Sequence, residues 1–176
     1  NVLAGGQGAD TLVGGEGNDT ADYSASKEGV YVSLADGYGK GGDADGDKLD
    51  SIENVRGSAN DDIFVGNSAD NVITGGEGSD TLILTGNYSD YLITYDESTQ
   101  AFTITDMRKG SPDGTDTVSQ VENFQFANGT ITVKEPADLL NEAPTFVSGT
   151  AATVAENTAG TVYTASAPDP DPLTTV

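Results

Sequence analysis

The chain has 176 residues, with 29 Asp and Glu against 7 Lys and Arg, a formal net charge of −22 at pH 7, and no His or Cys. Without imidazole or thiolate groups, zinc and copper centres and Ser-His-Asp or Cys-His nucleophiles are excluded. The charge opposes binding to nucleic acid or anionic lipid, and no apolar run approaches the roughly 18 residues of a membrane span. We therefore expect no nucleic-acid partner and no membrane insertion in this segment. What remains is a disordered acidic chain or a fold whose carboxylates bind hard cations.

A nine-residue pattern repeats from the start of the chain. Residues 5–13, 14–22 and 75–83 each read GGxGxD followed by three residues, and the middle one is apolar. Degenerate copies at 57–65 and 66–74 keep the register, although Asn71 replaces the Asp of the second copy and should weaken a site there. Residues 1–4 look like the tail of a further repeat, so we expect a piece of a longer protein with adjoining domains.

The pattern has a physical explanation. Glycines permit the positive φ of a tight turn and leave carbonyl oxygens exposed, and the three following residues form a short strand with one inward side chain. Successive turns would fall on opposite edges, so turns 18 residues apart stack and their oxygens form a cage suited to Ca²⁺. The expected calcium-site residues in these repeats are Gly5, Gly6, Gly8, Asp10, Gly14, Gly15, Gly17, Asp19, Gly57, Asp62, Gly75, Gly76, Gly78 and Asp80. A flexible acidic linker is the alternative, but it does not explain apolar residues at one fixed offset.

The repeat resembles the RTX, or hemolysin-type, calcium-binding nonapeptide, G-G-x-G-x-D-x-U-x with U apolar. The resemblance covers residues 1 to about 84. It implies a parallel β-roll with Ca²⁺ as its cofactor, in a secreted or cell-surface bacterial protein that a type I apparatus exports unfolded.

Residues 23–56 interrupt the period, and we expect them to continue the roll with longer coils. Val30, Val32 and Leu34 alternate as in a strand, and Ile52 and Val55 fit a further one. The loop between them contains Asp43, Asp45 and Asp47. If successive turns continue to alternate between the two edges, this loop lies on the edge of the 14–19 turn, and we expect its three carboxylates to face Asp19. An EF-hand is excluded, because Lys48 and Asn54 occupy the positions that need Gly and Glu.

Residues 85–135 predict an antiparallel β cap, which a repeat stack needs to cover its open end. Aromatic and aliphatic residues alternate there, with a turn at 96–100 and a hairpin at Asn128-Gly129. We expect the aromatics to form a core, although a sugar-stacking platform is the alternative. Asp106, Asp113 and Asp116 suggest another cation site.

Residues 136–142 are expected to be a linker, and residues 143–176 resemble the opening of a cadherin-like repeat. The resemblance rests on N-E-A-P, A-E-N and A-P-D-P-D segments, and it implies Glu156, Asp169 and Asp171 as possible ligands. The predicted fold is therefore all-β: a parallel β-roll at 1–84, an antiparallel β cap at 85–135, and a truncated β-sandwich start.

The predicted function is a structural calcium-binding module, not an enzyme. Without calcium the stacked carboxylates repel one another and the apolar content is thin, so the roll should fold on meeting extracellular calcium. An adhesin-like parent with its cell-surface or carbohydrate target elsewhere is the preferred context. An accessory C-terminal domain of a type I secreted enzyme or toxin is the alternative. A carbohydrate- or ice-binding face is a third reading, but the sequence shows no regular Thr-x-Thr ladder.

Overall fold

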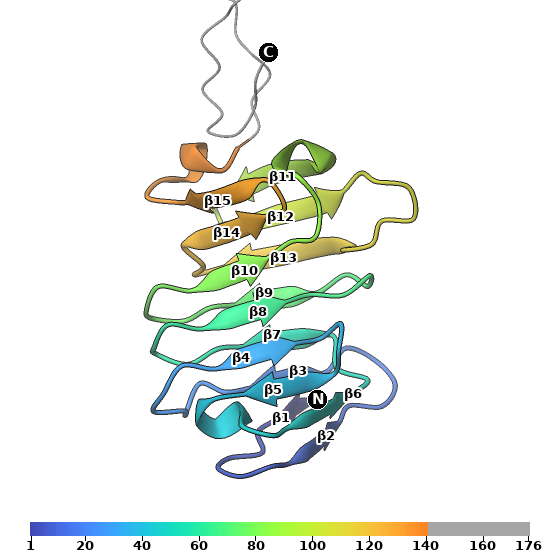
Figure 1. Cartoon of the computed structure of the whole chain (residues 1–176), viewed down its shortest axis with the longest axis vertical. Helices are drawn as coiled ribbons and strands as arrows, with labels where there is room; N and C mark the ends of the chain where they lie inside the picture. Colours follow the sequence, from blue (N-terminus) through green and yellow to red (C-terminus); the bar gives the residue numbers. More distant parts are fainter. Residues whose placement is uncertain (141–176) are drawn as a thin grey trace, which may run out of the picture.

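The computed structural model describes residues 1–140 as two β-sheets that face each other along the long axis of the molecule (Figure 1). Sheet A has seven strands, in the order β1 (Val2–Leu3), β3 (Thr20–Asp22), β7 (Asn54–Arg56), β9 (Val72–Thr74), β13 (Thr115–Ser119), β12 (Ala101–Asp106) and β11 (Tyr91–Asp96). Sheet B has eight, in the order β15 (Gly129–Thr132), β14 (Asn123–Phe126), β10 (Thr81–Ile83), β8 (Ile63–Val65), β4 (Tyr31–Ser33), β5 (Tyr38–Lys40), β6 (Lys48–Asp50) and β2 (Thr11–Val13). Three short 3₁₀ helices complete it: η1 (Gly42–Ala44), η2 (Tyr88–Asp90) and η3 (Pro136–Asp138).

The strands of the repeats pair in parallel at a spacing of 18 residues. Ile63 lies opposite Thr81, and Asn54 lies opposite Val72. The middle residue of each three-residue strand points between the sheets, so Phe64, Ile73 and Leu82 are fully buried. The parallel β-roll expected from the nine-residue period is therefore confirmed.

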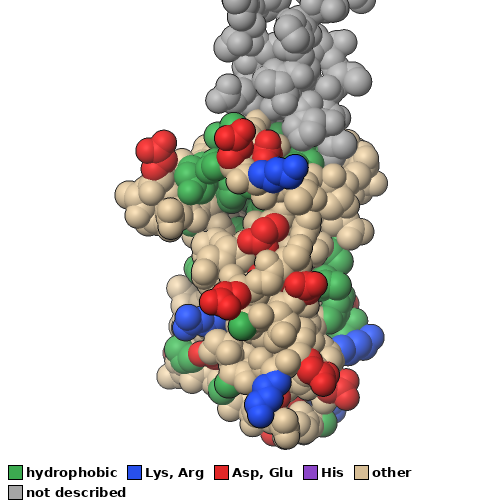
Figure 2. All heavy atoms as spheres, turned by 90° about the vertical axis from the view of Figure 1, so that its left-hand side faces the viewer, with side chains coloured by type: hydrophobic (Ala, Val, Ile, Leu, Met, Phe, Trp, Pro, Cys, Tyr) green, Lys and Arg blue, Asp and Glu red, His purple; other side chains and the backbone are tan. Residues whose placement is uncertain are grey.

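The connections between the sheets define two edges. We call the edge that carries residues 4–10, 23–30, 57–62, 75–80 and 120–122 the first edge, which lies on the left of Figure 1. The second edge carries residues 14–19, 51–53 and 66–71. Figure 2 faces the first edge and shows a surface that is mostly backbone and uncharged side chains, with Asp and Glu spread along its length.

Residues 31–50 form a three-strand meander of β4, β5 and β6 within sheet B, and the chain then returns to sheet A as β7, so residues 23–56 continue the roll with one long coil. β4 pairs in parallel with β8, β5 is antiparallel to both β4 and β6, and β6 pairs in parallel with β2. Val55 lies in β7 as expected, but Ile52 lies before that strand, in the connection that follows the bend at Ser51. Because β5 reverses direction, the loop at 41–47 emerges at the first edge, opposite to the edge that carries Asp19.

The C-terminal end of the roll combines parallel and antiparallel pairing. β13 and β14 pair in parallel with β9 and β10 and so add one more coil to the stack. The antiparallel strands β12, β11 and β15 then close the two sheets. The hairpin loop consists of Ala127 and Asn128, because Gly129 already belongs to β15.

The aromatic residues of this end form a core, as expected. Tyr88, Tyr91 and Phe126 pack ring against ring, and so do Phe102 and Phe124. All five are buried. The cadherin-like pattern at 143–176 lies outside the described residues.

Candidate metal centre: the glycine and aspartate turns

Three turns, at residues 5–10, 14–19 and 75–80, have the full GGxGxD sequence, and we call them the complete turns. The glycines at the second and fourth positions of each turn have positive φ, for example 125° at Gly76 and 122° at Gly78. That conformation is costly for residues with a Cβ, so these positions require glycine.

The first glycine of a complete turn is needed for space rather than for φ. A Cβ at Gly75 would collide with the carbonyl oxygen of Gln120 and with Oδ2 of Asp80. A Cβ at Gly14 would likewise collide with the carbonyl oxygen of Ser51 and with the Asp19 side chain. A carbonyl oxygen of the neighbouring coil and the turn's own carboxylate therefore converge on each of these glycines.

The carboxylates of the complete turns each keep one oxygen without a hydrogen-bond donor. Within residues 1–140 the buried side-chain oxygens or nitrogens that lack a partner are Oδ2 of Asp10, of Asp19 and of Asp80. Asp19 and Asp80 have 0% of their surface exposed. A buried, unpaired carboxylate oxygen is costly unless a cation or donor reaches it, so these atoms point to a bound cation.

The turns at 57–62 and 66–71, which we call the degenerate turns, satisfy their own polar groups. Oδ2 of Asp62 accepts the amide of Ser58 at 2.6 Å, and its Oδ1 accepts the Ser58 hydroxyl and the amide of Val30. In the second turn, the side-chain oxygen of Asn71 accepts the amide of Asn67 at 2.9 Å. Both oxygens of Asp62 are therefore engaged, and the Asn71 side chain brings no charge.

A ladder of amide-to-carboxylate hydrogen bonds links neighbouring coils along each edge. On the first edge the amide of Asp62 donates to Oδ1 of Asp80, and the amide of Asp80 donates to Oε2 of Glu122. On the second edge the amide of Asp19 donates to Oε2 of Glu53, and the amide of Asn71 donates to Oδ1 of Asp116. The stacking of Asp62 on Asp80 follows the 18-residue period, as the sequence predicted.

Sequence reasoning missed Glu53, Glu122 and Asp116 as members of these ladders. A signal was present for the two glutamates, because residues 52–54 and 121–123 both read Ile or Val, Glu, Asn before an apolar residue. Their place in the repeat becomes visible only when Val55 and Phe124 are aligned with the inward positions of the other strands.

Burial sets the electrostatics of the ladders. It raises the pKa of Asp80 to about 7, and the carboxylates of Asp62 and Glu122 add to that rise. Burial also raises the pKa of Asp62, and it raises the pKa of Asp116 to about 8. Negative charge is thus disfavoured at these buried positions in the absence of a cation.

The loop at 41–47 lies beside the complete turn at 5–10, so the expectation that it faces Asp19 is wrong. The amide of Asp10 donates to Oδ1 of Asp47 at 2.8 Å, and the buried Tyr23 hydroxyl donates to Oδ2 of Asp47. Asp43 and Asp45 line a cavity of about 350 Å³ together with Gln7, Gly8, Lys27, Glu28 and Gly42. The meander in sheet B causes this, because the single reversal between β4 and β5 returns the chain to the first edge before residues 41–47.

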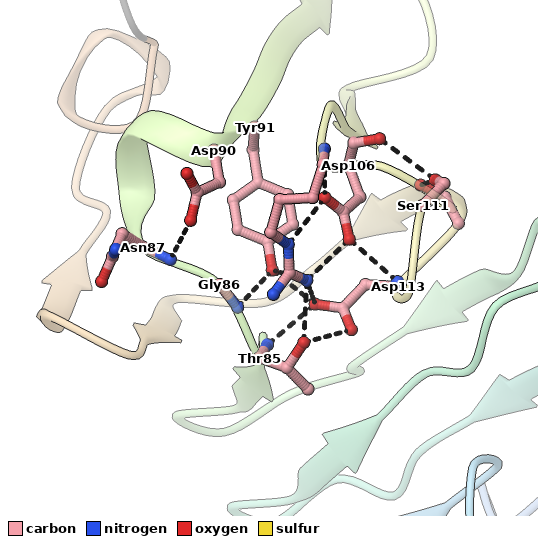
Figure 3. A network of polar contacts seen from close by, with 10 residues as sticks. Thr85, Gly86, Asn87, Asp90, Tyr91, Asp106, Ser111 and Asp113 are labelled. Atoms are coloured by element: carbon pink, nitrogen blue, oxygen red, sulfur yellow. Dashed lines mark hydrogen bonds and ion pairs between the residues drawn. The ribbon is translucent and has the colours of Figure 1, made fainter.

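The three acidic residues of the C-terminal end do not converge on one cation site. Figure 3 shows Asp106 and Asp113 in one polar network with Thr85 and Tyr91. Asp116 lies outside this network, and its Oδ1 accepts the amide of Asn71. Arg108 supplies the positive charge, at 2.6 Å from Asp106 and 3.2 Å from Asp113. Its hydrogen bond lowers the pKa of Asp106. A protein cation thus occupies the place where the sequence suggested a metal.

The residues present fit Ca²⁺ rather than a metal held by side chains alone. Across residues 1–140 no three Asp or Glu side chains gather closely enough to hold an ion by themselves. Backbone carbonyls must therefore contribute, as is common for Ca²⁺ with its six to eight oxygen ligands. The complete turns provide both types of oxygen.

Residues 1–24 and 56–88 match the sequence model of the RTX calcium-binding nonapeptide repeat, in four copies. These segments are RTX repeats. All three complete turns and both degenerate turns lie within the matched RTX segments, which cover less than half of the chain. RTX repeats bind Ca²⁺ and are typical of secreted proteins.

A search among curated proteins finds no relative of the chain. The part of the chain that the structure describes contains no helix long and apolar enough to cross a membrane.

Proposed function

We propose that the chain is a structural calcium-binding module of a secreted or cell-surface protein, and that its roll folds on exposure to extracellular calcium. The observation that carries this proposal is the set of buried, unpartnered carboxylate oxygens of Asp10, Asp19 and Asp80, each inside an RTX turn. The proposed role is structural rather than catalytic, since these carboxylates stand where neighbouring coils meet.

The energetics support a calcium switch. In the calcium-free roll, burial raises the pKa of Asp80 to about 7, so folding at neutral pH opposes its charge. Extracellular calcium modules have dissociation constants of roughly 10⁻⁴–10⁻³ M, close to calcium levels outside cells. A ligand that binds only the folded state stabilises it by mass action, so the chain would stay largely unfolded in cytosol and fold outside.

A far-UV circular dichroism titration tests this function. The full chain is taken from chelator into millimolar CaCl₂, with MgCl₂ as the control. We expect a transition from coil to β signal with calcium alone. A β spectrum already complete in chelator and unchanged by calcium would refute the switch.

A matched pair of variants then locates the switch. Asp80→Asn removes the charge from a complete turn, and we expect its calcium midpoint to rise by about tenfold or more. Asp70→Asn removes an equal charge from an exposed position of a degenerate turn and should leave the midpoint unchanged. Equal shifts in the two variants would show that only overall charge matters.

For the parent protein we propose an adhesin-like context, with type I secretion as the export route. The support is the cadherin-like pattern in residues 143–176. Tandem copies of that pattern in the flanking sequence of the protein would support the adhesin, and a catalytic signature there would favour an accessory domain of a secreted enzyme.

A further inference from the structure

Two short turns outside the matched RTX segments share a sequence pattern and a backbone conformation, and we call them the Glu–Asn turns. They are Ser51-Ile52-Glu53-Asn54 and Gln120-Val121-Glu122-Asn123. The first residue has positive φ in both, 55° and 53°, and the second is buried in both. The Asn begins a strand of the roll in both, β7 and β14.

Each Glu–Asn turn stacks on a complete turn through the same contacts. Oε2 of Glu122 accepts the amide of Asp80 at 2.9 Å, and the amide of Asn123 donates to the Asp80 carbonyl at 2.9 Å. At the other edge, Glu53 and Asn54 make the same two contacts with Asp19, also at 2.9 Å. Two pairs of turns at opposite edges, far apart in sequence, thus have one geometry.

At both pairings a backbone carbonyl oxygen of the Glu–Asn turn and the Asp side chain of the complete turn lie close to the same glycine. Only a glycine fits at position 75, because the Gln120 carbonyl oxygen and Oδ2 of Asp80 both crowd that point. At Gly14 the Ser51 carbonyl oxygen and the Asp19 side chain do the same. Each pairing therefore brings together a fully buried Asp with a free oxygen, a carbonyl oxygen and a Glu carboxylate.

Within residues 1–140, no complete turn stacks on another complete turn. On the first edge the turn at 75–80 lies between the degenerate turn at 57–62 and the Glu–Asn turn at 120–123. Both oxygens of Asp62 already accept hydrogen bonds from Ser58 and Val30, so the degenerate turn leaves no free carboxylate oxygen. Glu122, whose Oε2 accepts the Asp80 amide, is therefore the candidate for the second carboxylate of an ion at Asp80.

We propose that the two Glu–Asn turns are calcium half-sites that complete the ligand sets of the turns at 75–80 and 14–19. The ligands are Oδ2 of Asp80, the Gln120 carbonyl oxygen and the Glu122 carboxylate at the first edge, and the corresponding atoms of Asp19, Ser51 and Glu53 at the second. Two carboxylates in each site balance the two charges of the ion. This inference rests on the proposed function, because it presupposes that the complete turns bind calcium.

Calcium stoichiometry of the full chain tests the inference, measured by equilibrium dialysis and isothermal titration calorimetry. Glu122→Gln keeps an oxygen for the Asp80 amide but removes the charge. We expect it to bind one ion fewer than the wild type, or to hold that ion at least about tenfold more weakly. Glu97→Gln, an equal charge change at an exposed position of the β11–β12 turn, should bind as the wild type does.

Circular dichroism at saturating calcium checks that each variant is folded, and Glu53→Gln provides an independent test at the other edge. A wild-type number and midpoint of bound ions in both glutamate variants would overturn this inference alone, and would make the Glu–Asn turns hydrogen-bonding ends of the ladders. A wild-type chain that binds no calcium would overturn the proposed function as well.

Discussion

The complete and degenerate turns occupy equivalent places in the same roll, yet they handle their carboxylates in opposite ways. In the complete turn at 75–80, glycines at the second and fourth positions take positive φ, and Oδ2 of Asp80 is left without a donor. In the degenerate turn at 57–62, Ser58 replaces the second glycine and donates its amide and hydroxyl to Asp62. One turn leaves a carboxylate oxygen open to a cation, and in the other both carboxylate oxygens accept hydrogen bonds from Ser58 and Val30.

The difference shows that the glycines do more than allow a tight turn. The degenerate turns still reverse the chain although they retain only the first glycine of the motif, at positions 57 and 66. The glycines at the second and fourth positions are associated with the open carboxylate. In the turns that lack them, the side chain of Asp62 or Asn71 accepts a hydrogen bond from an amide of the same turn. A repeat that loses these two glycines can still stack, but it no longer presents a free carboxylate oxygen.

The largest expected effect comes from filling the space at the first glycine. Gly75→Ala places a methyl group against the Gln120 carbonyl oxygen, which is backbone and cannot move aside, so we expect a loss of about 3 kcal/mol or more. Gly66→Ala in a degenerate turn meets only side-chain oxygens at 2.9 and 3.2 Å and should cost about 1 kcal/mol. Denaturant unfolding in saturating calcium measures both. Equal losses would contradict the expectation that the rigid carbonyl oxygen of Gln120 makes a methyl group at position 75 more costly than one at position 66.

The C-terminal end extends the comparison, because two carboxylates there, those of Asp106 and Asp113, pair with Arg108. Arg108→Gln leaves Asp106, which is buried, without its charge partner, and we expect about 2 kcal/mol of destabilisation in saturating calcium. The calcium midpoint should change little once this loss is allowed for, because Arg108 belongs to no proposed calcium site. Arg56→Gln, at an exposed position on β7, is the control and should be near neutral. A lost calcium ion in Arg108→Gln would show that the two regions are not independent.

Asp62 tests the degenerate turn directly. The sequence suggests it as a ligand that shares an ion with Asp80, whereas its two oxygens accept three hydrogen bonds in the structure. Asp62→Asn replaces one acceptor by a donor that faces an amide, so we expect a loss of about 1–2 kcal/mol that is the same at every calcium concentration at which the roll is folded. Thermal unfolding at several calcium concentrations distinguishes a role of Asp62 as a hydrogen-bond acceptor from a role as a calcium ligand. A calcium stoichiometry reduced by one would establish Asp62 as a ligand after all.

A further prediction concerns the dependence of stability on pH. Burial raises the pKa of Asp116 to about 8, far above the ordinary value near 4, so the folded chain retains a proton that the unfolded chain has released. Stability should therefore fall as pH rises from about 4 to about 8, and then level off. Asp116→Asn removes this contribution and should be more stable than the wild type at pH 9 but equal to it at pH 4, in denaturant unfolding with saturating calcium. A pH profile unchanged by Asp116→Asn would show that the charge of Asp116 is compensated in the folded chain.

Local sequence was sufficient to predict the repeating part of the fold. The nine-residue period fixes the inward residues, such as Phe64 and Leu82, because a three-residue strand has only one side chain between the sheets. It also fixes the register, since two turns and two strands return the chain to the same edge after 18 residues. The calcium site is also indicated by local sequence, because the glycines that shape the turn and the Asp that supplies the carboxylate lie within six consecutive residues.

Where the period is broken, only the tertiary structure decides which residues meet. The meander of residues 31–50 brings Asp47 beside Asp10 rather than Asp19, because β5 reverses the chain within one sheet. Glu122 reaches Asp80 from 42 residues away, and Arg108 takes the place of a metal between Asp106 and Asp113. The sequence by itself therefore determined the coil, its core and the chemistry of its turns. The partner of each carboxylate was decided by which coils become neighbours, and that depends on strand pairings that no local pattern specifies.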